Sequence, residues 1–196
     1  MKYIFLVPDG MADYPLPELE GKTPLMAAKT PFLDKIACSG TIGRAKTIPP
    51  GLSPGSDVAN LSLLGYDPLK FYSGRAPLEA ANIGVKLGPD EIAFRCNLIT
   101  VQDGLIEDYS SGHITNSDAR QVIACLNNNL GSRTVKFYAG VSYRNLLVIK
   151  SKDNENLLKL KCFPPHDFKS KKAEDYLPQG EGNELLLLLI AKAQEI

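Results

Sequence analysis

The chain has no tryptophan, only two histidines, four cysteines and no net charge among its 196 residues. Because basic and acidic side chains balance, no overall field would recruit nucleic acid or an anionic membrane. The cysteines lie far apart and form no C-x-x-C pair, which argues against a disulfide framework or a zinc site. We therefore expect free thiols in a reducing compartment and partners that are neither nucleic acids nor membranes.

Long apolar runs are also lacking. The run at 3–7 reaches Pro8 too early for a signal peptide, and the run at 185–191 is too short to span a bilayer. An apolar share of 44% and a charged share of 22% are typical of a folded soluble protein, and 196 residues suffice for one domain and part of another. We expect a cytoplasmic protein.

Residues 54–68 form the most informative stretch. Ser56 follows a Pro-Gly turn and precedes an apolar run with helical spacing, so its hydroxyl is predicted near a helix N-terminus. Backbone N–H groups and the positive end of the helix dipole favour an anion there. The alternative is that Ser56 serves only as the helix N-cap, a position that serine favours. The spacing alone favours the N-cap, whereas the rest of the chain favours a nucleophile.

Asp9 follows a continuous apolar run at 3–7, which is predicted to be a strand buried on both faces of a parallel sheet. Open α/β sheets bind ligands at the carboxyl ends of their strands, which is where Asp9 would lie. The alternative is an ordinary Asp-Gly bend. A second strand is predicted at 41–48, and Thr-Pro pairs open short helices at 23 and 30.

From residue 92 onward the pattern changes to a small α+β unit. Expected elements are strands at 92–101 and 105–109 around a hairpin turn, a helix at 117–126, strands at 134–139 and 143–150, and a last helix at 183–194. Residues 152–161 show no pattern, and 163–182 are predicted to be loop. The expected domains are residues 1–88, 89–182 and 183–196.

Several stretches taken together resemble one known family. They are 7–13 (VPDGMAD), 55–68 (GSDVANLSLLGYDP), 73–80 (SGRAPLEA) and 109–114 (YSSGHI), with 93–98 and 164–167. In this order they resemble the archaeal-type cofactor-independent phosphoglycerate mutases of the alkaline phosphatase superfamily. The resemblance implies an α/β fold with part of an alkaline-phosphatase-like parallel-sheet core, followed by an inserted α+β cap domain.

The resemblance also implies an activity. Members of the family interconvert 3-phosphoglycerate and 2-phosphoglycerate through a phosphoserine, without 2,3-bisphosphoglycerate. Ser56 matches the nucleophile, and Asp9 and Ser56 match ligands of two divalent metal ions, usually Mn²⁺ and sometimes Mg²⁺, Zn²⁺ or Co²⁺. Arg75, His113 and Arg144 fall where the family or its longer bacterial relatives have substrate-contacting residues. His113 could also act as acid or base on the substrate hydroxyl.

Part of the family pattern is missing. Family members are about twice as long, and their other metal ligands lie beyond the last residue here. Neither His113 nor His166 stands in a metal-binding spacing. We therefore expect an N-terminal portion of a longer enzyme, inactive by itself. The alternatives are another phosphotransferase of the superfamily, such as a phosphopentomutase, and a non-catalytic module for oligomerisation or anion binding; a homo-oligomer is left open.

Overall fold

The computed structural model describes residues 1–152 and 154–196, and the chain divides into two compact units, Met1–Tyr72 and Ser73–Ile196. The domain limits predicted after residues 88 and 182 stay predictions, since the compact units report only which residues pack together. The described residues form a mixed α/β structure whose small sheets are antiparallel.

Short helices make up the first unit. They are η1 (Pro17–Leu19), α1 (Pro24–Ala27), α2 (Pro31–Ser39), α3 (Ser56–Leu63) and α4 (Pro68–Phe71). All of these helices except α3 have a proline in the first turn. The fixed φ of proline suits the start of a helix. The Thr23 hydroxyl accepts a hydrogen bond from the Met26 amide and caps α1. The helices predicted after Thr23 and Thr30 are thus confirmed.

The strand predicted at 3–7 is wrong for this structure. These residues form no strand, and Tyr3 and Ile4 are 80% and 90% exposed. Residues 41–48 likewise form no strand. The physical reason is that a strand is stable only beside another strand, and the described part of the first unit contains none. The run at 3–7 has the composition of a buried strand without a neighbour to pair with.

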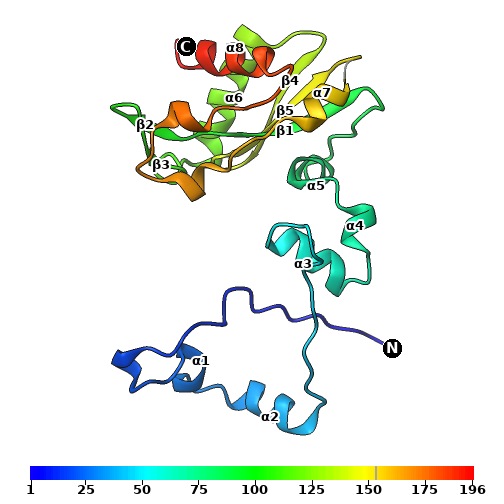
Figure 1. Cartoon of the computed structure of the whole chain (residues 1–196), viewed down its shortest axis with the longest axis vertical. Helices are drawn as coiled ribbons and strands as arrows, with labels where there is room; N and C mark the ends of the chain where they lie inside the picture. Colours follow the sequence, from blue (N-terminus) through cyan, green and yellow to red (C-terminus); the bar gives the residue numbers. More distant parts are fainter. Residues whose placement is uncertain (153) are drawn as a thin grey trace. The chain divides into compact units, whose positions relative to one another are not determined.

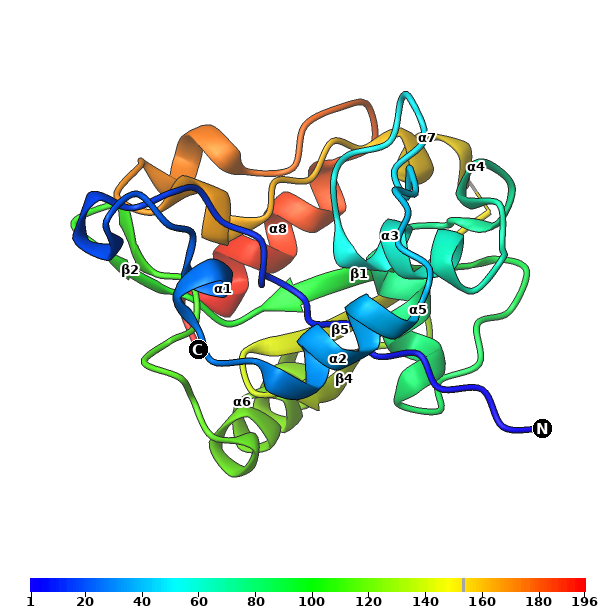
Figure 2. The ribbon, with the colours of Figure 1, turned by 90° about the horizontal axis from the view of Figure 1, so that it is seen from below.

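A three-stranded antiparallel sheet is the centre of the second unit (Figures 1 and 2). Its strands are β1 (Glu91–Asn97), β4 (Val135–Val141) and β5 (Arg144–Lys150), in the order β1-β5-β4. The register pairs Glu91 with Lys150 and Asn97 with Arg144. Five consecutive residues of β5, 145–149, are buried. Such a strand must be covered on both faces.

Helices supply that cover (Figure 1). On one face lie α6 (Asn116–Leu130) and α8 (Glu184–Ala193), and on the other lies α5 (Arg75–Asn82). The first core contains Ile92, Ile123, Leu126, Val135, Phe137, Leu147, Ile149, Leu157, Leu186 and Leu189. The second, smaller core contains Ala76, Ala80, Ala93, Leu146 and Val148. The strands predicted at 134–139 and 143–150 and the last helix are therefore confirmed.

The remaining elements surround this sandwich. The predicted hairpin turn is confirmed between β2 (Thr100–Gln102) and β3 (Leu105–Asp108). It lies at Asp103 and Gly104, and both residues have positive φ. The sequence did not predict α7 (Asn154–Lys159) or the short turns η2 (Pro165–Phe168) and η3 (Ala173–Tyr176). Among the described residues no helix is both long and apolar enough to cross a membrane.

Candidate active site

Ser56 and Asp9 meet in the first unit. The Ser56 hydroxyl donates a hydrogen bond of 2.7 Å to Asp9 Oδ2, although the two residues are 47 positions apart in the chain. The N-cap of α3 is Gly55, and Ser56 is the first residue of the helix. The alternative that Ser56 serves only as the N-cap is therefore wrong. Both Ser56 and Asp9 are exposed. A serine bonded to a carboxylate at a helix N-terminus is an arrangement that can activate a nucleophile.

The surroundings fix both partners. Asp9 stands in a bend whose next residue, Gly10, has φ +76°, a conformation that glycine adopts without strain. The Asp-Gly bend and the carboxylate contact therefore coexist. The Tyr72 hydroxyl donates to the Asp57 carboxylate in the first turn of α3, and Ser62 donates to the Thr47 carbonyl at 2.7 Å. These bonds hold α3 in place within its unit.

The side-chain oxygens of Asp9 and Ser56 determine which metal ions this pair could bind. Asp9 and Ser56 offer a carboxylate and a hydroxyl, the hard oxygen ligands that Mn²⁺ and Mg²⁺ accept. The described residues contain no group of three or more His, Cys, Asp or Glu that could hold a metal ion. The pair therefore fits as a share of a metal site and cannot hold two ions by itself.

His113 lies in a polar loop of the second unit, as predicted. The Asp108 carboxylate organises this loop, since it accepts bonds from the Ser110 amide and hydroxyl at 2.8 and 2.7 Å and from the Gly112 amide at 2.6 Å. These bonds, the Ser110 amide foremost, lower the pKa of Asp108 to about 2. Ser110 is only 2% exposed, whereas His113 is exposed at the end of the loop.

The loop is joined to the turn between β4 and β5, which is followed directly by Arg144, the first residue of β5. The Ser142 hydroxyl donates to the Ile114 carbonyl at 2.7 Å. The Tyr109 ring packs edge-on against Tyr143 with centroids 5.8 Å apart, and the Arg144 guanidinium lies 5.8 Å from the Tyr143 ring centre. The fold thus brings the His113 and Arg144 segments together.

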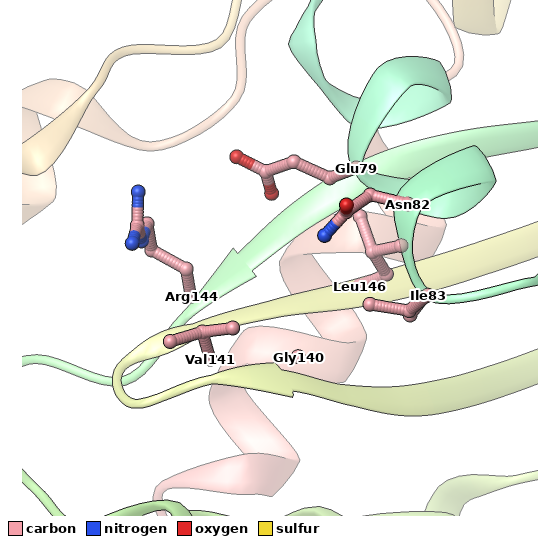
Figure 3. Close-up of a pocket in the computed structure, with 7 residues that line it drawn as sticks. All are labelled: Glu79, Asn82, Ile83, Gly140, Val141, Arg144 and Leu146. Carbon is pink, nitrogen blue, oxygen red and sulfur yellow. The ribbon is translucent and has the colours of Figure 1, made fainter.

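Arg144 lines a small hollow of about 110 Å³ beside α5 (Figure 3). Figure 3 shows the Glu79 and Asn82 side chains entering it from α5 while Arg144 enters from β5. Arg95 Nε lies 3.2 Å from Glu79 Oε1, so Glu79 is already paired. The hollow therefore presents the Arg144 cation beside a neutralised carboxylate, a setting suited to an anion.

Arg75 is the exposed first residue of α5. The helix begins at Arg75 because Gly74, with φ +96°, makes the turn into it. Arg75, His113 and Arg144 belong to the second unit, and Asp9 and Ser56 to the first. The structure brings together Asp9 with Ser56 and the segments of His113 and Arg144.

Sequence reasoning missed the residues that hold this site. Asp108 and Ser110 carried a usable signal, because an Asp shortly before Ser-Ser-Gly favours an Asx turn. In such a turn the Asp side chain accepts the backbone amide two residues on, as Asp108 accepts that of Ser110. Asn145 carried none. It is fully buried, with its Oδ1 accepting from the Gly140 amide at 3.0 Å and its Nδ2 donating to the Ser142 carbonyl at 3.3 Å.

The family model of the 2,3-bisphosphoglycerate-independent phosphoglycerate mutases matches residues 37–196. The chain belongs to this family. A Methanosarcina barkeri phosphoglycerate mutase is 55% identical over 193 residues, covering 98% of this chain and 48% of its own length. A Methanosarcina mazei member is 49% identical over 100% of this chain and 49% of its own.

A solved structure agrees with these relatives. The cofactor-independent phosphoglycerate mutase from Thermoplasma acidophilum matches with a TM-score of 0.54 and 28% identity, over 95% of this chain and 50% of that one. The chain therefore spans about half the length of the family members it matches. The resemblance noted from the motifs is confirmed.

Proposed function

We propose that this chain is the nucleophile-bearing part of a phosphoglycerate mutase that interconverts 3-phosphoglycerate and 2-phosphoglycerate through a phosphoserine at Ser56. The observation that carries the proposal is the 2.7 Å bond from the Ser56 hydroxyl to Asp9 at the start of α3. The names of the relatives supply the substrate class. The enzyme would act in the cytoplasm on the glycolytic and gluconeogenic route.

The chain's own residues suggest the steps. Asp9 takes the proton as Ser56 Oγ attacks phosphorus, the bond from phosphorus to the substrate oxygen breaks, and His113 protonates that oxygen. The first turn of α3 stabilises charge on the phosphoryl oxygens. Arg75 and Arg144 hold the glycerate while it turns. The other hydroxyl, deprotonated by His113, then attacks the phosphoserine, and the proton on Asp9 returns to Ser56.

The metal requirement is part of the proposal. Asp9 and Ser56 would be this chain's share of the ligands for two divalent ions, with Mn²⁺ favoured and Mg²⁺, Zn²⁺ or Co²⁺ as substitutes. Such ions, when bound, lower the pKa of the serine hydroxyl. The oxygen donors support this assignment, and the remaining ligands would come from a further polypeptide segment.

The same segment would complete the fold. We propose that 3–7 and 41–48 become strands of an alkaline-phosphatase-like parallel sheet once it is present. The exposed apolar side chains at 3–7 support this, because a folded protein rarely leaves such a run uncovered. Residues 89–182, which lie within the second unit, would then be the cap domain.

A complementation assay tests the proposal. The purified chain is mixed with Mn²⁺ and with the portion of the Methanosarcina barkeri relative that this chain does not cover, and 3-phosphoglycerate conversion is followed by ³¹P NMR. We expect 2-phosphoglycerate from the mixture and none from either component alone. Ser56→Ala should lower the rate by more than about a thousandfold.

Ser53→Ala is the matched control, since Ser53 is an exposed serine in the loop that precedes α3. It should retain the rate of the unmodified mixture. Conversion by the chain alone would refute the need for a second segment. Conversion by the Ser56→Ala mixture at the unmodified rate would refute the phosphoserine.

A further inference from the structure

The loop that carries His113 has an unusual backbone. Ser111, Gly112 and His113 have φ values of +49°, +65° and +56°, three consecutive residues in the left-handed region. Side chains other than glycine adopt this region at a cost, so two of the three positions are strained. Something outside these residues must hold the loop.

Asp108 is the residue that holds it. Its Oδ1 accepts both the Ser110 amide and the Ser110 hydroxyl, and its Oδ2 accepts the Gly112 amide. The Ser110 hydroxyl in turn accepts the His113 amide at 3.3 Å. The carboxylate therefore fixes the backbone on both sides of Ser111. It also acts on the His113 amide through the Ser110 hydroxyl. The pKa of about 2 keeps Asp108 charged at any physiological pH.

The same loop faces the Arg144 turn. Tyr109, adjacent to Asp108, packs against Tyr143 and also against the His166 ring, with centroids 6.1 Å apart. Residue Ile114, adjacent to His113, is bonded to Ser142. Ser110 and Gly112, whose amides Asp108 accepts, therefore lie between two contacts that place the His113 segment beside the Arg144 segment.

We propose that Asp108 is a positioning residue for the His113 side of the substrate site. Its carboxylate sets the loop in the one conformation that presents the imidazole toward a phosphoglycerate anion held at Arg144. This inference rests on the proposed function for its ligand, and its structural half stands without it.

The chain's two histidines make the test specific. The full chain is labelled with ¹⁵N-histidine, and 3-phosphoglycerate is titrated while both imidazole spectra are recorded. We expect the His113 signals to shift more than those of His166.

Asp108→Asn keeps one side-chain oxygen, Oδ1, as the acceptor for Ser110 and loses the acceptor for the Gly112 amide. It should therefore weaken the apparent affinity for 3-phosphoglycerate by about tenfold, and Asp108→Ala should weaken it by more. Glu107→Gln removes the same charge from an exposed neighbour and should change nothing.

A measurement without ligand separates the two proposals. The three-bond amide coupling of Ser111 and the relaxation of the His113 ring should report one ordered conformation in the unmodified chain and averaging in Asp108→Asn, with the melting temperature unchanged. If the unmodified chain shows no shift with 3-phosphoglycerate, the assigned role of His113 fails, and the ligand-free spectra still decide the role of Asp108. Spectra of Asp108→Ala identical to those of the unmodified chain would overturn the positioning role.

Discussion

Gly140 shows how one residue holds the turn that carries Arg144. A Cβ at this position would clash with the Arg144 carbonyl oxygen, a backbone atom that cannot move aside. We therefore expect Gly140→Ala to lower the free energy of unfolding of the second unit by about 2 kcal/mol, as overpacking does. Urea unfolding followed by circular dichroism measures this. Gly88→Ala is the control, since its Cβ would make only ordinary contacts, the nearest at 3.4 Å. Equal midpoints for the two variants would contradict the close approach.

At the scale of the element, α6 depends on its first turn. The Thr115 hydroxyl accepts from the Asp118 amide at 3.2 Å and donates to the Asp118 carboxylate at 2.8 Å. Thr115→Ala should cost about 1 kcal/mol because it leaves an amide of the first turn unsatisfied, and the loss should appear in thermal unfolding of the second unit. Thr23→Ala removes the corresponding cap of α1 in the first unit. A loss in the second unit that is as large for Thr23→Ala would contradict a specific role for the Thr115 cap.

Elements were predictable from the sequence where local pattern and packing agree. The strand predicted at 143–150 forms as β5 because its consecutive apolar residues are buried in the cores on both faces of the sheet. The helix predicted to end at 126 continues to Leu130, where Asn127 Oδ1 accepts the Phe137 amide at 3.1 Å, a tertiary contact that no local pattern reveals. The strand predicted at 3–7 does not form, although its local pattern is that of a strand. A strand needs a partner strand from another part of the chain, and local pattern does not show whether one is present. The contact between the His113 and Arg144 segments joins residues far apart in sequence and was equally hidden.

At the scale of the whole molecule, the two units differ in how much they bury. The second contains both apolar cores, whereas residues 3–7 of the first are exposed. Hydrogen exchange should therefore be slow for the amides of β5 and close to the free-peptide rate at 3–7. Mass spectrometry of exchanged peptides measures both. Strong protection at 3–7 in the isolated chain would contradict the structure, and protection that arises only with the complementing segment would support the proposed sheet.

The order of the strands in the chain determines how long β1 lacks its partner strand during synthesis. β1 is complete at Asn97, but its neighbour β5 begins only at Arg144, and the helix that closes the first core, α8, comes last. On a ribosome this gap lasts on the order of seconds at ordinary elongation rates. Throughout it, Ile92 and Phe94 emerge into the cell without the surface they later cover. The nascent chain therefore exposes the unpaired edge of β1 while residues 98–150 are made, and a chaperone that acts on this edge must do so before Lys150 leaves the ribosomal tunnel.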